Sequence, residues 1–198
     1  QDAVRAGLAA IAAGEVSKVV LARDLAGTVP AGSDLRRLVR SLASGYPDTW
    51  VYAVHGLIGA SPERVAFTSG GTESDNWAIK GALEKASESN GGRPVHVVTS
   101  VFEHAAVLSS VDALRRRGVE ASYLRVGRAG VVDPDDLRRA MRSNTALVSV
   151  MHANNEVGTI QPIEELARIA HERGALFHVD AVQTAGHAIV DVDALGAD

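Results

Sequence analysis

Hydrophobic positions follow two different rhythms along the chain. Near its start, Val4, Leu8 and Ile11 recur at helical spacing, which predicts a short amphipathic helix between Asp2 and Gly14. The other elements expected in this part are a strand over residues 16–23, a helix over 33–45 and a strand over 50–55. Residues 1–63 are therefore expected to form an α+β segment.

From residue 64 onward, short apolar runs alternate regularly with amphipathic stretches. Strands are expected over residues 65–67, 95–99, 121–126, 146–151 and 175–180, with helices over 73–86, about 107–117, from Asp133 onward, and over 162–173. Strands that alternate with helices of this length form βαβ units, whose parallel strands are covered on both faces. Residues 64–198 are thus predicted to be an α/β domain with a parallel-rich sheet.

Composition and charge narrow the class of protein. The 198 residues are 46% hydrophobic and 22% charged, with a formal net charge of −4, which is typical of a globular chain. Basic residues are dispersed, which argues against a nucleic-acid or anionic-membrane surface, and the triple arginine at 115–117 is interpreted as a helix end. The longest small-apolar stretch, Gly7–Gly14, is too short to span a membrane and lacks the cationic lead of a signal peptide, so a cytoplasmic location is expected.

Two kinds of site are excluded by residue content. The chain has no cysteine, which rules out disulfides, thiolate metal sites and a cysteine nucleophile within these residues. His178 stands two residues before Asp180, but no third ligand is in view and no zinc-type histidine spacing occurs. No metal site is expected in residues 64–198.

A glycine turn, Thr68–Thr72, stands between a predicted strand and the start of a predicted helix. Unpaired backbone N–H groups and the positive end of the helix dipole favour a phosphate at such a place. The spacing matches neither a dinucleotide-binding fingerprint nor a Walker loop, so any phosphate would belong to another cofactor. A plain turn before a helix is the alternative interpretation.

Four polar residues fall at or just after the C-terminal ends of predicted strands: His104, Asn155, Asp180 and Gln183. This edge of an open α/β sheet is where ligands bind. Asp180 follows an apolar strand, where a buried carboxylate is costly unless a cation such as a pyridinium nitrogen pairs with it. A structural cap is the alternative role for Asp180.

Several segments in this order resemble the pyridoxal-phosphate-dependent cysteine desulfurases of the class V aminotransferase group. The segments that carry the resemblance are Phe67–Asn76, Glu103–His104, Met151–Gly158 and His178–Gln183. The resemblance covers about Val65 to Asp198 and implies the large domain of a PLP-dependent transferase. It also implies transfer of sulfur from L-cysteine, and a homodimer if enough of this domain is folded.

Site roles follow from the same resemblance. It implies that Gly71 and Thr72 bind the cofactor phosphate and that His104, a catalytic candidate, stacks on the pyridine ring. It implies further that Asp180 pairs with the ring nitrogen, that Gln183 bonds the phenolic oxygen, and that Asn155 lies beside that oxygen and the substrate. An anionic Asp180 would keep the ring nitrogen protonated, so that PLP can act as an electron sink.

The sequence also departs from that family. The lysine that binds the cofactor covalently is expected shortly beyond Asp198 and the sulfur-accepting cysteine much farther on, so the domain is expected to be truncated. Lys80 and Lys85 lie on the helix after the glycine turn and are expected to face solvent. We therefore expect no desulfurase turnover from these residues alone.

Residues 1–63 resemble a different family, the chorismate-utilising enzymes, and are closest to isochorismate synthases. The segments that carry this resemblance are Ile11–Arg23 and Gly56–Glu63. It implies that Lys18 is the general base that activates water for attack on chorismate, in a site whose Mg²⁺-binding glutamates lie beyond this segment. A surface lysine on an edge strand is the alternative interpretation of Lys18.

The two resemblances meet near residues 61–65, where both families have a Pro-Glu step. A composite chain is the hypothesis that we favour. A natural desulfurase with an unusual N-terminus and an error in the assembled sequence are the alternatives. Three functions follow: a desulfurase-type PLP domain, an isochorismate-synthase-like fragment that needs Mg²⁺, and a catalytically inert composite of two enzyme pieces.

Overall fold

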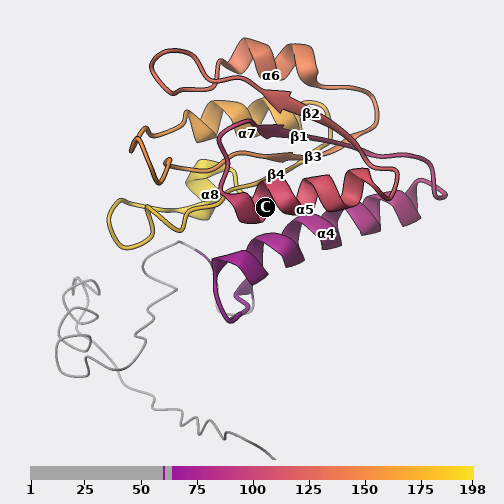
Figure 1. Cartoon of the computed structure of the whole chain (residues 1–198), viewed down its shortest axis with the longest axis horizontal. Coiled ribbons are helices and arrows are strands. Elements are labelled where there is room, and N and C mark those ends of the chain that lie inside the picture. Colours follow the sequence, from indigo (N-terminus) through magenta and orange to yellow (C-terminus); the bar gives the residue numbers. More distant parts are fainter. Residues whose placement is uncertain (1–59, 61–63) are drawn as a thin grey trace, which may run out of the picture. The chain divides into compact units, whose positions relative to one another are not determined.

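The computed structural model describes residue 60 and residues 64–198 (Figure 1). The helices and strands expected over residues 2–55 lie outside the described residues, and so does Lys18. The elements of the described part, in chain order, are α4 (Gly71–Ser89), β1 (His96–Ser100), α5 (Ala105–Arg115), β2 (Glu120–Leu124), α6 (Pro134–Ala140), β3 (Thr145–Ser149), α7 (Ile163–His171), β4 (Leu176–His178) and α8 (Val192–Leu195). Helices and strands alternate, as the hydrophobic pattern predicts.

The four strands form one sheet in the order β2-β1-β3-β4. All three strand pairs are parallel, with Val98 opposite Val148 and Val148 opposite Phe177. The parallel α/β architecture predicted for residues 64–198 is therefore confirmed. Because all the strands run in one direction, their C-terminal ends lie along the same edge of the sheet.

Neighbouring residues of the central strands pack on opposite faces of the sheet. Val97 and Leu147 belong to a core with α4 and α5, whereas Val98 and Val148 belong to a second core with α6 and α7. Figure 1 shows α4 and α5 on one side of the sheet and α6 on the other. Burial on both faces explains why these strands read as continuous apolar runs in the sequence.

Several predicted helix ends are confirmed. The carboxylate of Asp133 accepts a hydrogen bond from the Asp135 N–H at 2.8 Å, and Pro134 occupies the first turn of α6. Arg115 ends α5 and Gly118 follows at φ 100°, a conformation that favours glycine. The interpretation of the arginines at 115–117 as a helix end thus agrees with the structure.

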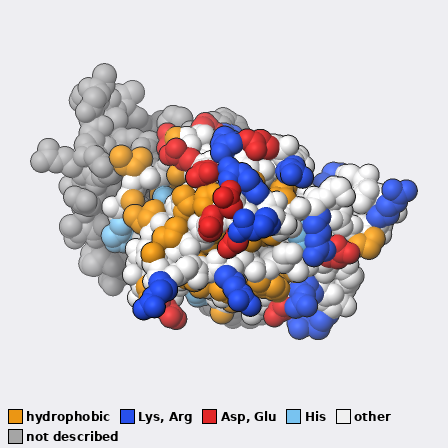
Figure 2. All heavy atoms as spheres, turned by 90° about the horizontal axis from the view of Figure 1, so that it is seen from above, with side chains coloured by type: hydrophobic (Ala, Val, Ile, Leu, Met, Phe, Trp, Pro, Cys, Tyr) orange, Lys and Arg blue, Asp and Glu red, His pale blue; other side chains and the backbone are white. Residues whose placement is uncertain are grey.

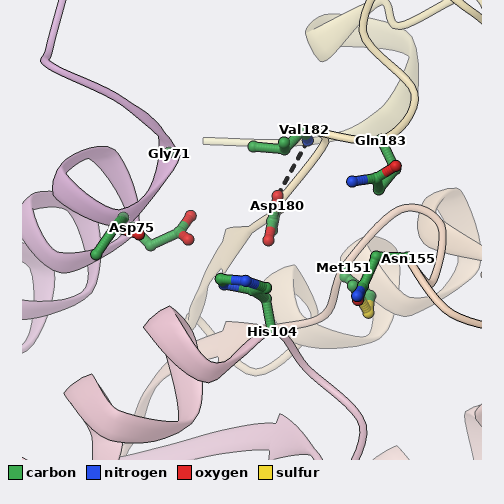
Figure 3. A pocket seen from close by; sticks show the side chains of 9 residues that line it. Gly71, Asp75, His104, Met151, Asn155, Asp180, Val182 and Gln183 are labelled. Atoms are coloured by element: carbon green, nitrogen blue, oxygen red, sulfur yellow. Dashed lines mark hydrogen bonds between the residues drawn. The ribbon is translucent and has the colours of Figure 1, made fainter.

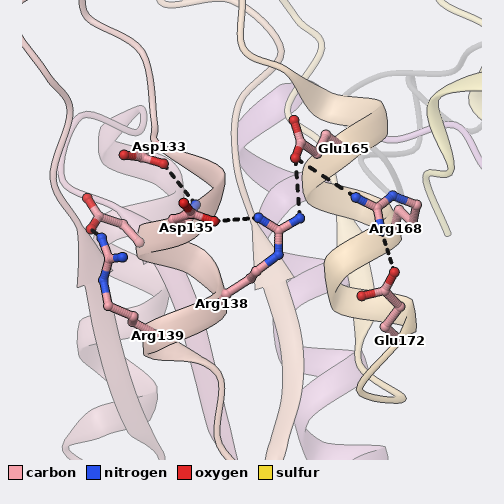
Figure 4. Close-up of polar contacts among 8 residues, drawn as sticks. Asp133, Asp135, Arg138, Arg139, Glu165, Arg168 and Glu172 are labelled. Atoms are coloured by element: carbon pink, nitrogen blue, oxygen red, sulfur yellow. Dashed lines mark hydrogen bonds and ion pairs between the residues drawn. The ribbon is translucent and has the colours of Figure 1, made fainter.

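Salt bridges connect the exposed sides of α6 and α7 (Figure 4). Arg138 donates to Asp135 at 2.6 Å and to Glu165 at 3.3 Å, and Arg168 pairs with Glu165 and Glu172. Figure 2 shows basic and acidic side chains intermixed on one face of the molecule. Exposed ion pairs of this kind contribute about 0–1 kcal/mol each, so the apolar cores supply most of the stability.

Two sequence predictions are wrong near the start of the described part. Residues 65–67 are irregular instead of forming a strand, and the side chain of Phe67 is 68% exposed. The helix predicted over residues 73–86 is longer in the structure, because residues 71–72 and 87–89 also belong to α4. An apolar run of three residues is too short to distinguish a strand from a loop, and polar helix ends carry no hydrophobic signal.

Other predicted strands are shorter in the structure. Val126 leaves β2 and forms an isolated antiparallel bridge with Val132. Residues 150–151 lie beyond β3, and residues 175 and 179–180 lie outside β4. The apolar runs continue past the strand ends because several of these residues remain packed in the core. The hydrophobic pattern depends on burial, whereas a strand ends where its backbone pairing ends.

We expect Phe177→Ala to destabilise the domain strongly. Phe177 is fully buried in the core formed with α6 and α7, and removing a buried Phe side chain costs about 3–5 kcal/mol. Urea unfolding should show that the free energy of unfolding is lower by that amount. Leu176→Ala is the matched control, because Leu176 lies on the same strand but is 45% exposed, and its loss should be much smaller. Equal losses would contradict this account of the core.

Candidate functional site

A cavity of about 220 Å³ lies at the C-terminal edge of the sheet, between the start of α4, the start of α5 and the loops that follow β3 and β4. Its lining residues come from four separate chain segments: Gly71, Thr72, Asp75, His104, Met151, Asn155, Asp180, Val182 and Gln183. Figure 3 shows the side chains of Asp75, His104 and Asp180 directed toward one another. The volume suits a single-ring ligand, since it is smaller than the pockets of about 300–1,000 Å³ that hold drug-sized ligands.

All six residues that the sequence predicts to bind a cofactor line this cavity. They are Gly71, Thr72, His104, Asn155, Asp180 and Gln183. Their roles toward a ligand stay predictions, whereas their convergence is a property of the fold. The predicted catalytic lysine, Lys18, lies outside the described residues. Lys85 is exposed as expected, and Lys80 is half-buried instead of fully facing solvent.

The first turn of α4 forms one wall of the cavity. The N–H groups of Glu73 and Ser74 bond to the Gly70 carbonyl at 3.1 Å, which begins the helix. A methyl group in place of the Gly71 hydrogen would approach the Val182 Cγ2 atom to 2.8 Å. Glycine therefore keeps this wall open, because any larger side chain would narrow the space between α4 and the loop after β4.

The opposite wall contains Asp180, which directly follows the apolar run of β4. Its side chain is only 7% exposed, and one carboxyl oxygen accepts a hydrogen bond from the Val182 N–H at 3.0 Å. The Asp180 carbonyl accepts from the His152 N–H at 2.8 Å, which ties this loop to the end of β3. Figure 3 shows the carboxylate directed into the cavity.

His104 stands at the N-cap of α5 and presents its imidazole to the cavity. Its Nδ1 accepts a hydrogen bond from the Ala106 N–H at 3.2 Å, which orients the ring and leaves the proton of the neutral form on Nε2. The Asn154 amide donates to the Phe102 carbonyl at 3.0 Å, which joins the loop before His104 to the loop that carries Asn155. These two loops are therefore held together.

Asp75 is a site residue that the sequence analysis did not single out. Its side chain is 4% exposed, lies one helical turn after Gly71 and points into the cavity (Figure 3). Burial, followed by repulsion from Asp180, raises the pKa of Asp75 to about 6. Its spacing in the sequence could have identified it. Asp75 stands four residues before Ile79 and eight before Leu83, so it shares their buried helix face, where a carboxylate is unexpected.

Glu103 is a second carboxyl group that was missed. It is 5% exposed, and its Oε1 atom accepts hydrogen bonds from the Ser100 hydroxyl and from the Met151 N–H at 3.1 Å. Its Oε2 atom is buried without a hydrogen bond among the described residues. Burial raises the pKa of Glu103 to about 8, so the group is mainly protonated at neutral pH. Glu103 thereby joins the ends of β1 and β3 immediately before His104.

Comparison with known proteins agrees with this architecture. The sequence model of the family described as aminotransferase class-V matches residues 50–198. The chain belongs to the class-V aminotransferase family. A second model, described as chorismate binding enzyme, matches residues 1–81. Both resemblances inferred from sequence motifs are therefore supported by independent family matches.

Similar curated proteins are cysteine desulfurases. The chain is 53% identical over 141 residues to cysteine desulfurase IscS of Dictyoglomus turgidum, a match to 71% of this chain and 35% of that protein. It is 45% identical over 142 residues to a mitosomal cysteine desulfurase of Trachipleistophora hominis, covering 72% of this chain and 32% of the relative. The chain thus spans about a third of the length of these curated relatives. Cysteine desulfurases and class-V aminotransferases depend on pyridoxal phosphate.

Solved structures show the same fold. A NifS-like protein superposes with a TM-score of 0.67 at 36% identity, over 83% of this chain and 43% of that one. A structure described as SspA in complex with cysteine gives a TM-score of 0.68 at 36% identity, over 73% of this chain and 41% of the other. The likeness confirms the predicted large-domain fold.

In the described part of the chain, no helix is both long and apolar enough to cross a membrane.

We expect Glu103→Gln to remove a pH dependence of stability. The raised pKa means that the folded chain holds one more proton at Glu103 than the unfolded chain from about pH 4.5 to 8. Stability therefore falls as pH rises through that window, by up to about 1.4 kcal/mol per pH unit, and a neutral amide has no such dependence. Urea unfolding at pH 6, 7 and 8 measures the difference.

The window from pH 6 to 8 separates Glu103 from Asp75, whose transition ends at lower pH. Glu88→Gln serves as the control, because Glu88 is an exposed carboxylate at the far end of α4. The curve for this control should run parallel to that of the wild type. A parallel curve for Glu103→Gln as well would show that the buried carboxyl does not titrate as described.

Proposed function

We propose that residues 64–198 form the cofactor-binding part of a pyridoxal-phosphate-dependent cysteine desulfurase. One observation carries the proposal: the glycine turn before α4 and the buried carboxylate of Asp180 line the same cavity, with the imidazole of His104 beside them. A phosphate site, an acid for a ring nitrogen and a flat platform are the three features that a phosphorylated pyridine requires.

The residues present fit such a group. The start of a nineteen-residue helix offers free N–H groups to an anion, and Gly71 leaves room for it. Asp180 is buried, and its carboxylate is directed into the cavity, where a cationic ring nitrogen would offset the cost of its burial. The cavity is lined by both apolar and polar groups, as expected for a site that holds a ring and orients its substituents.

Each side chain then has a definite task. Gly71 and Thr72 hold the phosphate through N–H groups at the start of α4, and His104 lies against the ring. Asp180 holds the proton on the ring nitrogen, while the amides of Gln183 and Asn155 orient the ring substituents. Pyridoxal phosphate, when bound, supplies the electron sink that the chain's own side chains lack.

Substrate and assembly belong to the same proposal. The matched desulfurases support L-cysteine as the substrate, and the SspA structure was described with cysteine bound. The proposal includes a homodimer, as the family resemblance implies. The chain contains no cysteine, so the thiol that accepts sulfur in this family has no counterpart among its 198 residues.

A second candidate function concerns the first part of the chain. The chorismate binding enzyme match to residues 1–81 overlaps the aminotransferase match over residues 50–81. This overlap supports the proposal of a composite chain with a junction near residue 63, in which Lys18 belongs to a chorismate-type segment. Binding of chorismate that requires Mg²⁺ and is lost in Lys18→Ala would support it.

We expect Asp180→Asn to weaken binding of pyridoxal phosphate. The amide still accepts the hydrogen bond from the Val182 N–H but no longer pairs with a protonated ring nitrogen. Loss of one charged hydrogen bond corresponds to about 10- to 100-fold weaker binding. Titration with pyridoxal phosphate, followed by visible absorbance and thermal unfolding, measures the change.

Chorismate with Mg²⁺ is the ligand control in this titration, and Glu88→Gln is the protein control, since Glu88 lies at the opposite end of α4. Wild type and Glu88→Gln should gain similar thermal stability from pyridoxal phosphate. The absence of any stabilisation of the wild-type chain, or equal stabilisation of Asp180→Asn, would refute the proposed function.

A further inference from the structure

Asp75 places a second buried carboxyl group in the cavity, across from Asp180 (Figure 3). It is one helical turn beyond Gly71, so the two residues share a face of α4. Side chains on a helix lean toward its N-terminus, which brings the Asp75 carboxyl group close to the first turn. The same turn is the proposed phosphate site.

The groups that face Asp75 offer it little compensation. His178 on β4 has its Nε2 atom 3.7 Å from the Asp75 Oδ1 atom, a separation longer than a hydrogen bond. Within the described part of the chain, His178 is the one basic side chain within 4.0 Å of this carboxyl group. The remaining titratable groups that act on Asp75 are His104 on α5, Asp180 after β4 and Glu103 before α5.

His178 itself is uncharged at neutral pH. Burial lowers its pKa to about 4, and its Nδ1 atom is 2.9 Å from the Ser149 hydroxyl on β3. Asp75 therefore has a neutral imidazole behind it and the Asp180 carboxylate across the cavity. A phosphate at the start of α4 would add further negative charge on its own helix face.

We propose that Asp75 is a proton-holding residue of the ligand site, ionised in the free chain near neutral pH and protonated when a phosphate-bearing ligand binds at Gly71 and Thr72. This inference rests on the proposed function. The proton comes from solvent and forms an O–H bond with a carboxyl oxygen of Asp75, and no other bond of the protein or the ligand forms or breaks. Proton uptake removes the repulsion between the carboxylate and the phosphate while Asp180 keeps its charge for the ring nitrogen.

The direction of the pH dependence follows from the raised pKa of about 6 in the free chain. Below pH 6 Asp75 already carries the proton, so binding needs no uptake. As pH rises above 6, binding must draw a proton from solvent, and affinity falls by up to about tenfold per pH unit relative to a chain without this carboxylate. A neutral side chain at position 75 removes that dependence.

Calorimetric titration with pyridoxine 5′-phosphate tests the proposal, because this alcohol cannot react with lysine amines. Wild type and Asp75→Asn are titrated at pH 7 in two buffers that differ in ionisation enthalpy, which gives the number of protons taken up. We expect the wild type to take up about one proton more than Asp75→Asn. The affinity of Asp75→Asn divided by that of the wild type should be near one at pH 5 and increase between pH 6 and 8.

Unphosphorylated pyridoxine is the matched ligand control, and with it the wild type should show no such uptake. Comparing these two ligands on the wild-type chain also tests the proposal if Asp75→Asn fails to fold. Two results overturn the role of Asp75 while leaving the proposed function intact. One is equal proton uptake by wild type and Asp75→Asn, and the other is equal proton uptake by the wild type with pyridoxine and with pyridoxine 5′-phosphate. No binding of pyridoxine 5′-phosphate by the wild type at pH 6 or 8 overturns both.

Discussion

The parallel pairing of β1, β3 and β4 is the constraint on which the cavity depends. Because these strands run in one direction, the loops that follow them lie at one edge of the sheet, and residues far apart in sequence line one cavity there. Backbone and side-chain hydrogen bonds tie these loops together: Glu103 to Met151, Asn154 to Phe102, and His152 to Asp180. The positions of the site residues are therefore set by the register of the sheet more than by any single loop.

Three buried carboxyl groups lie near one another at this edge of the sheet: Asp75 and Asp180 line the cavity, and Glu103 is buried behind it, next to His104. Burying three acids together has an electrostatic cost. Asp180 is compensated by the Val182 N–H, and Glu103 avoids charge because burial raises its pKa to about 8. Burial and repulsion from Asp180 raise the pKa of Asp75 to about 6, and among the described residues its one basic neighbour within 4.0 Å is the neutral His178. Buried groups with strongly perturbed pKa values cluster at functional sites, as Asp75 and Glu103 do here.

Sequence reasoning succeeded where a residue's neighbours in the chain determine its place. The glycine turn at the start of a predicted helix located Gly71 and Thr72, and the ends of apolar strands located His104 and Asp180. It failed for Val65–Phe67, where three apolar residues carry too little pattern, and for Asp75, whose helix position is polar in sequence but buried in the fold. Burial of that carboxylate depends on α5, β4 and the following loop, which no local window of sequence contains.

The sequence by itself determined the family, the alternation of strands and helices, and the residue types available to a phosphorylated pyridine ring. These properties depend on local propensity, on hydrophobic period and on motifs whose residues are adjacent in the chain. Only the tertiary structure decided that the carboxyl groups of Asp75 and Glu103 are buried beside that of Asp180, and that this burial raises the pKa of both Asp75 and Glu103. The reason is physical: the pKa of a buried acid is set by the solvent it loses and by charges brought to it through folding, and both arise from chain segments that are distant in sequence.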